Sequence, residues 1–232
     1  MSRLDIPRLF LSRCAGVVHV GAHTGQEASF YGKLGIPVLW LEAVPAYHES
    51  LRDSIKVWPL QKSACALVSS VEGKKVIFHL TGADGQSSSI YPLSDLGRSS
   101  WSIDETNTIE LATTTLDTIL DHSPMPMADG ILIDVQGAEY DVLVGAKACL
   151  RQFTTIVCEV STEEFYTGQS KYSSVANILR ANGFFPVTIP HKSHANVVWA
   201  RPFTIAKLIV QSPTILLRIL KWYIYAKRFG PV

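Results

Sequence analysis

A short apolar strand that enters a turn bracketed by two glycines, and then a helix, constrains the fold of this chain more than any other feature. Residues 17–26 read VVHVGAHTGQ, so Gly21 follows the strand and Gly25 stands where a segment of helical period begins. Glycine lets the backbone approach a ligand closely, and a helix start offers free N–H groups. The segment predicts a ligand-binding turn, although the two glycines could also serve only to shape a tight connection.

A carboxylate follows at the spacing that nucleotide-binding α/β proteins use. The next predicted strand, residues 37–41, is followed by Glu42, about 20 residues beyond the turn, where such folds bind ribose hydroxyls. The glycines form GxxxG and not the GxGxxG of dinucleotide sites, which favours S-adenosylmethionine over a nicotinamide cofactor.

The whole chain alternates between β-rich runs and segments of helical period, which predicts an α/β fold. The expected strands are residues 16–20, 37–41, 57–66, 74–80, 108–113, 130–135 and 155–160, with 184–188 and 196–200 as a closing antiparallel pair. The expected helices are residues 25–35, 45–55, 116–120, 138–150 and 173–182. Residues 81–107, rich in Gly, Ser and Asp, are predicted to form a long functional or mobile loop.

A second strand delivers polar groups to the same edge of the predicted sheet. Residues 131–139 read ILIDVQGAE, so Asp134 and Gln136 follow an apolar strand, as ligand-binding groups do in open α/β sheets. Both should face the crevice beside Gly21. Alternatively, Asp134 could cap the helix that follows, and Glu139 could complement its dipole.

Composition narrows the classes of partner. The chain has 232 residues, 47% of them apolar, enough for one good core, and its net charge of +1 gives no strong field toward nucleic acid. The four cysteines, with no CxxC pair, are expected to be buried free thiols in a reducing compartment. No signal peptide or uncharged spanning segment is evident, so a cytoplasmic location is expected.

At this point the chain resembles the FkbM family of S-adenosylmethionine-dependent methyltransferases. The similarity covers roughly residues 17–199 and rests on VGAHTGQ (20–26), LEAVP (41–45), TTTLDTIL (113–120) and IDVQGAEYDVLVGA (133–146). It implies a single-domain class I methyltransferase, Rossmann-like, with a seven-stranded, mostly parallel sheet. It also implies that the glycine turn and Glu42 hold the methyl donor, and that methyl passes to a hydroxyl of a sugar or natural product.

Two departures from the family pattern matter. His19 stands where an acid often precedes the glycine turn, and Leu132 replaces a frequent lysine before IDV. They keep open a catalytically silent protein that binds a glycan or a partner on the same scaffold. A nicotinamide-dependent oxidoreductase is the third alternative.

Methyl transfer to a hydroxyl needs an aligned acceptor and a base within hydrogen-bond reach. Asp134 is the first candidate base. Glu139 and Glu159 are second choices, placed to orient the acceptor or the base, and His23 is an imidazole on the turn that could be structural instead. Strand-end acids can also hold magnesium, but the spacing of Asp134 and Glu159 fixes no geometry, so no metal is predicted. The predicted donor-binding residues are Gly21, Ala22, His23, Gly25, Glu42, Ala43, Asp134 and Gln136.

Two loops could reach the acceptor. Residues 82–100 carry Asp84 and the run 87–89, with Trp101 nearby, a mixture of polar and aromatic groups suited to sugars. Residues 191–194 lie between the last two strands, and most such charged loops are simply solvated.

The predicted organisation is an N-terminal helical, basic extension (1–15), the methyltransferase domain (16–203) and an amphipathic helical tail (204–232). Along residues 207–228, basic and polar side chains recur near helical spacing opposite Ile, Leu, Trp and Tyr. Such a helix could pack on its own domain, on another subunit of an oligomer, or at a membrane surface as a peripheral contact.

Overall fold

The computed structural model describes residues 5–82, 84–123, 125, 127–190, 192–211 and 214–229 of the chain. The main strands are β1 (Val17–Val20), β2 (Val38–Glu42), β3 (Gln61–Cys65), β7 (Gly130–Ile133), β8 (Thr155–Ser161), β9 (Phe185–Pro186) and β10 (His194–Ala200). They form one seven-stranded sheet in the order β3-β2-β1-β7-β8-β10-β9. Neighbours from β3 to β8 are parallel, whereas β10 is antiparallel to both β8 and β9. The predicted α/β class and closing antiparallel pair are confirmed.

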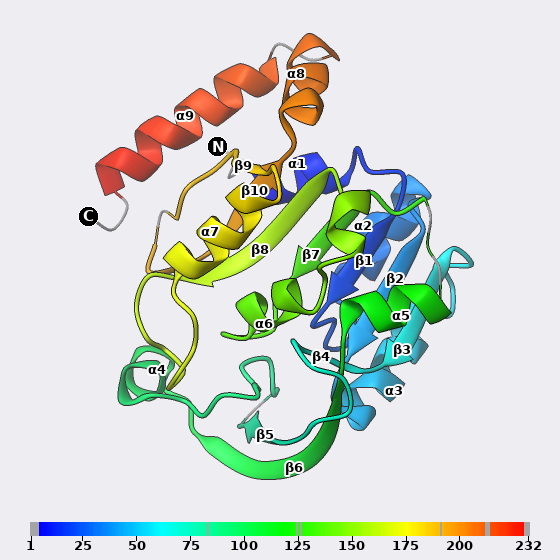
Figure 1. Ribbon diagram of the computed structural model, residues 1–232, viewed down its shortest axis with the longest axis vertical. Coiled ribbons are helices and arrows are strands. Elements are labelled where there is room, and N and C mark those ends of the chain that lie inside the picture. Colours follow the sequence, from blue (N-terminus) through cyan, green and yellow to red (C-terminus); the bar gives the residue numbers. More distant parts are fainter. Residues whose placement is uncertain are drawn as a thin grey trace.

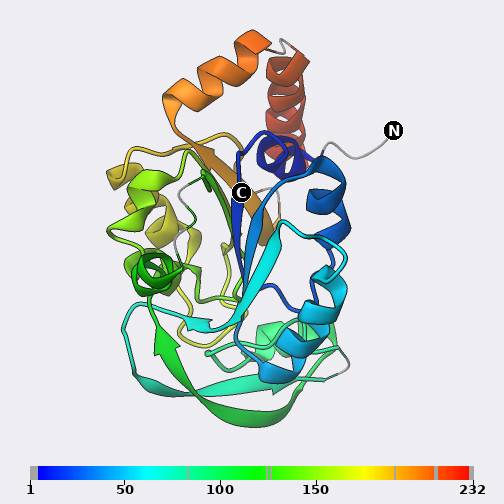
Figure 2. The same ribbon diagram turned by 90° about the vertical axis from the view of Figure 1, so that its right-hand side faces the viewer.

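Helices cover both faces of this sheet, because its central strands are apolar on both sides (Figures 1 and 2). One face packs against α5 (Leu116–His122), α6 (Glu139–Val144) and α7 (Tyr172–Ala181). The other packs against α1 (Ile6–Leu11), α2 (Ala28–Leu34) and α3 (Pro45–Ile55), together with α8 (Pro202–Gln211) and α9 (Thr214–Phe229). Both terminal segments therefore join the core of the same domain, and the predicted boundaries at residues 15 and 204 stay predictions.

A second, smaller sheet lies across the end of the domain at which the parallel strands finish (Figure 1). Its members are β4 (Leu67–Val68), β5 (Lys75–Thr81) and β6 (Glu105–Thr114), in the order β4-β6-β5. The strands expected at 74–80 and 108–113 thus exist, but they pair with each other and leave the main sheet. The loop expected at 81–107 is shorter and contains α4 (Asp95–Trp101), which Ser94 caps by accepting a hydrogen bond from the Gly97 N–H.

Two further expectations need correction. The helix predicted over 138–150 ends at Val144, and a separate 3₁₀ turn, Cys149–Gln152, follows. The Asp117 carboxylate accepts hydrogen bonds from the N–H groups of Ala148 and Cys149 and so fixes a new start there. All four cysteines are free, but Cys65 is exposed, contrary to the expectation of buried thiols.

Within the described residues, no single helix combines the length and the apolar content needed to cross a membrane. Segment 202–210 of α8 and segment 214–221 of α9 pass that test only as a pair, bent by 113°.

Candidate functional site

The glycine turn lies where the carboxyl ends of β1 and β7 approach each other. Gly21 has φ +83°, and a Cβ at that position would overlap the carbonyl oxygen of Asp134. Gly25 has φ +77°, and a Cβ there would stand 2.7 Å from the Leu51 side chain. Only glycine satisfies both the backbone angle and the close approach, so these two residues are required by the geometry of the turn.

Glu42 ties this turn to the end of β2. Its two carboxylate oxygens accept hydrogen bonds from the N–H groups of His23, at 2.7 Å, and Val44, at 2.8 Å. The side chain is buried, and burial raises the pKa of Glu42 to about 6 although both hydrogen bonds favour the ionised form. The carboxylate is therefore held rigidly by backbone groups, with part of its accepting capacity left toward the cavity beside it.

Two adjoining cavities open at this edge of the sheet. The first is a narrow slot of about 60 Å³ with mostly apolar walls. Its walls include Glu42, Ala43, Val44, Tyr47, Leu67, Val68, Phe78 and Ile90. The second is wider, about 470 Å³, and more polar, with Gln26, Glu27, Gln86, Ser87, Trp101, Glu159, His194 and Asn196 among its walls. Gly21, His23, Gln86, Asp134 and Gln136 line both cavities, so they form one site with two compartments.

A cluster of side chains closes the wider compartment at the ends of β7 and β8. Gln136, with φ +55°, donates through Nε2 to Asp134 Oδ1 at 2.7 Å and to Glu159 Oε2 at 2.6 Å. His194 Nε2 lies 3.0 Å from Glu159 Oε1, and its Nδ1 lies 2.8 Å from the Ser161 hydroxyl. Because Glu159 can only accept when it is ionised, His194 donates through Nε2 and accepts from Ser161.

The two carboxyl groups of this cluster share a proton. Burial raises the pKa of Glu159 to about 7, and burial together with the neighbouring Glu159 charge raises the pKa of Asp134 well above its usual range. The hydrogen bond between them favours the proton on Asp134 and the charge on Glu159. The pair can therefore accept a further proton near neutral pH, and Gln136 and His194 stabilise its ionised member.

Glu139 contacts the backbone of the turn that follows β7. Its Oε1 accepts hydrogen bonds from the N–H groups of Val135 and Gly137, each at 3.1 Å, and it lines neither cavity. Burial raises the pKa of Glu139 to about 7. Its contacts hold the turn that presents Asp134 and Gln136.

His23 is committed to the loop that covers the turn. Its Nε2 lies 2.7 Å from the carbonyl oxygen of Asp84 and so donates to it, while Nδ1 accepts from the Gln26 amide at 3.0 Å. The ring also packs against Tyr47, with 4.7 Å between ring centroids. With both nitrogens engaged, His23 joins the glycine turn to the loop after β5.

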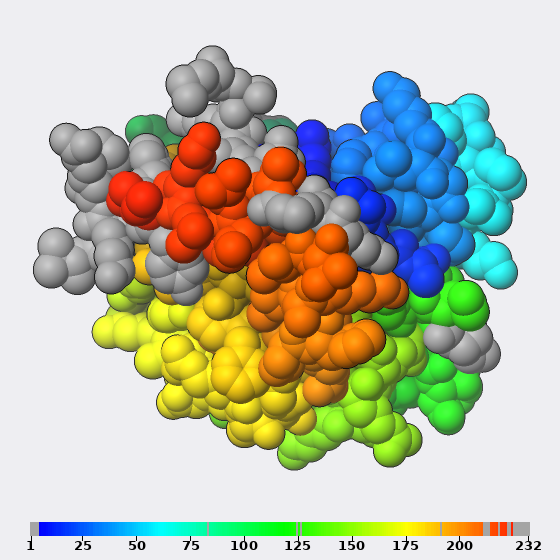
Figure 3. All heavy atoms as spheres, turned by 90° about the horizontal axis from the view of Figure 1, so that it is seen from above, coloured from blue at the N-terminus to red at the C-terminus, as the bar shows by residue number. Residues whose placement is uncertain are grey.

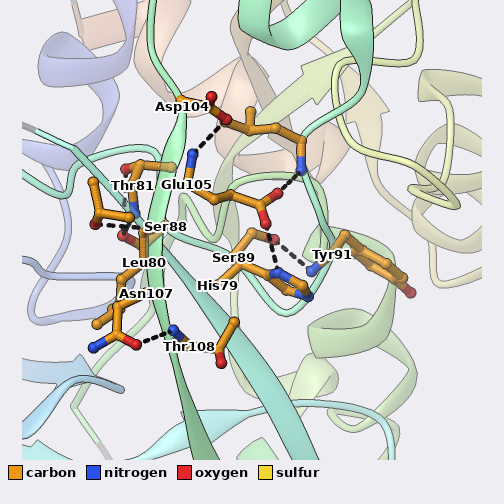
Figure 4. A network of polar contacts seen from close by, with 12 residues as sticks. His79, Leu80, Thr81, Ser88, Ser89, Tyr91, Asp104, Glu105, Asn107 and Thr108 are labelled. Carbon is orange, nitrogen blue, oxygen red and sulfur yellow. Dashed lines mark hydrogen bonds and ion pairs between the residues drawn. The ribbon is translucent and has the colours of Figure 1, made fainter.

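The small sheet anchors that loop above the cavities (Figure 4). The Glu105 carboxylate accepts from His79 Nδ1 at 2.9 Å and from the Leu93 N–H at 2.6 Å. The Ser89 hydroxyl reaches over the main sheet and donates to the carbonyl oxygen of Gln136 at 2.7 Å. The loop singled out in the sequence therefore contributes directly to the site, with Trp101 as an aromatic wall.

The two departures also lie in the wider compartment, since His19 and Leu132 both line it. His19 stacks on Trp40 with 4.6 Å between ring centroids, and burial lowers the pKa of His19 to about 3, so its ring is neutral. Its Nδ1 has no hydrogen-bond partner within the described part of the chain. Leu132 leaves this wall without a cation.

The sequence leaves open whether the loop that contains His194 reaches the site or is simply solvated. In the structure His194 begins β10 and lies opposite Ser161 in the antiparallel register, beside the wider compartment. The useful signal was that β10 pairs with the strand carrying Glu159, which places a histidine at the start of one strand beside the acid near the end of the other.

The strand order and a two-compartment site at the carboxyl ends of the parallel strands define a class I, Rossmann-like methyltransferase fold. The family model for the methyltransferase FkbM domain matches residues 19–186. The chain therefore belongs to the FkbM methyltransferase family, as its motifs indicated.

The individual proteins to which the chain is similar match it at low sequence identity. The 2-O-methyltransferase NoeI of Sinorhizobium fredii (strain NBRC 101917 / NGR234) is 26% identical over 171 residues, which cover 70% of each chain. Among solved structures, magnesium protoporphyrin IX methyltransferase from Synechocystis PCC 6803 with bound S-adenosylmethionine covers 85% of this chain and 77% of its own at 9% identity and TM-score 0.45. The S-adenosylmethionine complex of Aeropyrum pernix fibrillarin covers 82% and 68% at 10% identity, also with TM-score 0.45.

Proposed function

We propose that this protein transfers a methyl group from S-adenosylmethionine to a hydroxyl group of a sugar or natural product. The observation that carries the proposal is the shape of the site. A narrow apolar slot with a buried carboxylate at its edge adjoins a polar compartment that contains a proton-accepting carboxyl pair.

The residues of the narrow compartment fit the adenosine part of the donor. Ala43, Val44 and Phe78 offer apolar walls to a planar base, and Glu42 has accepting capacity left for ribose hydroxyls. Gly21 lines both compartments and Ala22 the wider one, so the turn itself forms part of the donor site. Gly21 and Gly25 give the turn its shape, because each has a positive φ and packs closely against other parts of the chain.

The wider compartment fits the positively charged part of the donor. Glu27 and Glu159 line it, and its described lining residues include no lysine or arginine. Negative groups in a partly enclosed site attract a cation more strongly than they would in water. S-adenosylmethionine supplies a methyl group bound to a positively charged sulfur.

The carboxyl pair provides the base. An acceptor oxygen aligned with the methyl group forms the new O–C bond while the S–C bond breaks, and its proton passes to the pair formed by Asp134 and Glu159. Asp134 is the member that lines both compartments, so we place it against the reacting hydroxyl, where it takes the hydroxyl proton as its own proton passes to the ionised Glu159. Glu159 shares the charge, and Gln136 keeps the two carboxyl groups in register.

Glu139 and His23 act as positioning residues in this scheme. Glu139 holds the backbone from Val135 to Gly137, and His23 fixes the loop that closes over the donor. Neither needs to exchange a proton with the acceptor.

The acceptor would lie against Trp101. This indole stacks on Phe165, with 4.9 Å between centroids, and stands in the polar compartment beside Gln86 and Asn196. An aromatic face surrounded by hydrogen-bonding groups suits a hydroxylated ring, and the neighbouring carboxyl groups disfavour an acidic one. The name of the relative, a 2-O-methyltransferase, also supports a hydroxyl acceptor.

The test is a methyl-transfer assay with S-adenosylmethionine labelled in its methyl group and a panel of neutral glycosides, uronic acids and polyketide alcohols. The proposal predicts a labelled methyl ether on at least one neutral member. Donor binding without transfer to any member would favour the catalytically silent alternative. Binding of NAD in place of S-adenosylmethionine would favour the oxidoreductase.

A further inference from the structure

The two C-terminal helices, α8 and α9, lie at the opposite end of the domain from the site. Arg201, which precedes α8, donates its backbone N–H to the carbonyl oxygen of Thr154, just before β8 begins. A groove between α8 and the domain is lined by Phe203 and Lys207 on one side and by Cys14 and Ile36, which precede β1 and β2, on the other. Figure 1 shows both helices at the top, whereas the small sheet that covers the site is at the bottom.

Each helix uses only one side to pack on the domain. Leu208 of α8 and Ile215 of α9 are buried in the core cluster that also contains α1, and Ile219 packs against that cluster. Since Ile215 and Ile219 are four residues apart, they lie on the same side of α9. The axis of α9 therefore runs along the surface of the domain.

A second set of apolar side chains on this pair of helices faces away from the domain. Val210 is 81% exposed and Ile224 68%. Leu216, Leu217 and Leu220 are exposed as well. These five residues define the outward apolar face, and Figure 3 looks down on this end of the molecule, where described residues of α8 and α9 form the orange and red part of the visible surface. Scattered exposed leucines are ordinary, but five large apolar residues within 15 positions are not.

The segment that carries this face has charges of one sign only. Residues 202–232 contain five of the 21 basic side chains (Lys207, Arg218, Lys221, Lys227 and Arg228) and none of the 20 acidic ones. Residues 1–201 consequently hold 16 basic against 20 acidic side chains. Lys207 and Lys221 are exposed. The chain as a whole is almost neutral because a basic end offsets an acidic remainder.

We propose that the outward apolar face binds the surface of a lipid bilayer that contains anionic lipids. Exposed apolar side chains can enter the boundary between headgroups and acyl chains while neighbouring lysines bind anionic headgroups. A second copy of this chain would bring the same positive charges together, which disfavours self-association through this face. Anionic headgroups supply the complementary charge that the helices lack.

Binding in this way sets the orientation of the enzyme. Because the outward apolar face and the two-compartment site are at opposite ends of the sheet, the site opens toward the aqueous phase. Transfer to a water-soluble acceptor should then proceed at the same rate with and without vesicles.

The experiment is flotation of the full chain with vesicles of pure phosphatidylcholine and with vesicles that also contain phosphatidylserine. The proposal predicts binding to the phosphatidylserine vesicles, weakened by added salt. The double variant Leu220→Glu/Ile224→Glu should lose about tenfold or more in partition, since two exposed apolar side chains that would enter the bilayer become charged. Lys207→Gln/Lys221→Gln should lose about 25-fold, at about fivefold per lysine.

Matched controls alter exposed residues at other places on the domain. Val57→Glu/Val71→Glu introduces the same two charges at exposed apolar positions, and Lys62→Gln/Lys147→Gln removes the same two positive charges. Both controls should bind like the unchanged protein. All variants should keep the unfolding midpoint, because every altered side chain is exposed.

The proposal is overturned if the chain does not float with phosphatidylserine vesicles, or if both control pairs reduce binding as much as the helix variants. The chain could instead dimerise in a concentration-dependent way without binding vesicles, and Leu220→Glu/Ile224→Glu could abolish that dimerisation. This result would assign the outward apolar face to a second copy of the chain and would also overturn the proposal.

Discussion

Two buried glutamates on neighbouring parts of the same site are held in opposite ways. Glu42 accepts hydrogen bonds from backbone N–H groups, those of His23 and Val44. Glu159 receives its hydrogen bonds from the side chains of Gln136 and His194 and faces a second carboxyl group. Backbone donors fix a charge in one place, whereas side-chain donors and a like-charged neighbour make a proton easy to gain or lose.

The difference distinguishes the residue proposed to bind the donor from the two residues proposed to take part in proton transfer. The carboxylate that is fixed by the backbone suits the constant task of holding a ligand, and the pair formed by Asp134 and Glu159 suits a step in which a proton moves. The variants below each remove one element of this contrast.

The largest effect is expected from Asp134→Asn. It keeps the size of the side chain but removes the carboxyl group that passes the hydroxyl proton on to Glu159, so kcat should fall by about a thousandfold while donor affinity changes little. Initial rates with the acceptor found in the transfer assay measure this. Asp121→Asn, at an exposed position outside the site, is the control and should keep full activity. Asp134→Asn with most of its turnover would remove Asp134 from the role of base.

Gly21→Ala should be the most destabilising change in the donor compartment. Its Cβ would overlap the Asp134 carbonyl oxygen, in addition to the cost of φ +83°, so we expect a loss of at least about 3 kcal/mol in the free energy of unfolding. Gly73→Ala has a similar φ of +70° with no atom near the added Cβ, and should cost only about 1 kcal/mol. Urea unfolding of both variants compares them, and equal losses would mean that the close approach at Gly21 is unimportant.

The shared proton predicts an unusual dependence of stability on pH. In the unfolded chain a glutamate loses its proton near pH 4.5, whereas folded Glu159 and Glu139 keep theirs until about pH 7. The unfolded state then binds fewer protons in this window, so the free energy of unfolding should fall as pH rises from 4.5 to 7. Glu159→Gln should reduce this decrease in the free energy of unfolding by on the order of 2 kcal/mol.

Urea unfolding at several pH values within that window measures the slope. Glu49→Gln, at an exposed position, should leave it unchanged. A stability that rises through this interval in the unchanged protein would contradict the assignment of a raised pKa to these buried carboxyl groups.

The smallest effect is expected at His194, which acts through Glu159. His194→Phe removes the N–H donor to Glu159 but keeps an aromatic ring beside Trp101. Without that donor the ionised form of Glu159 is less stable, so the pH–rate profile should move to higher pH and kcat should fall about tenfold at neutral pH. His194→Gln retains a donor and should recover part of the rate. An unchanged pH profile in His194→Phe would indicate a role in packing alone.

The parts of the site that lie close together in sequence were predictable. The strand at 17–20, Gly21 and Gly25, and the acid after the second strand follow from local periodicity and spacing, and the structure has β1, β2 and Glu42 there. The position of Asp134 beside the glycine turn follows from the same reasoning, because the carboxyl ends of parallel strands lie at one edge of the sheet.

The parts of the fold and of the site that depend on pairing between distant segments of the chain were not predictable. The 74–80 and 108–113 runs look like any other strands, and nothing local indicates that they form a separate sheet with β4. His194 reaches Glu159 only because β10 runs antiparallel to β8 in one particular register. Glu139 was a candidate because it follows the strand that delivers Asp134, but its contacts with backbone N–H groups depend on a turn with positive φ at Gln136 and Gly137.

The central claim is that the glycine turn and Glu42 bind the methyl donor. Isothermal titration calorimetry of S-adenosylmethionine and S-adenosylhomocysteine, with NAD as the control ligand, tests it directly on the unchanged protein and on Glu42→Gln. We predict binding of both sulfur compounds, no binding of NAD, and affinity at least about tenfold weaker in Glu42→Gln, which loses a charged hydrogen-bond acceptor. Equal donor affinity in the two proteins, or no donor binding at all, would contradict the account.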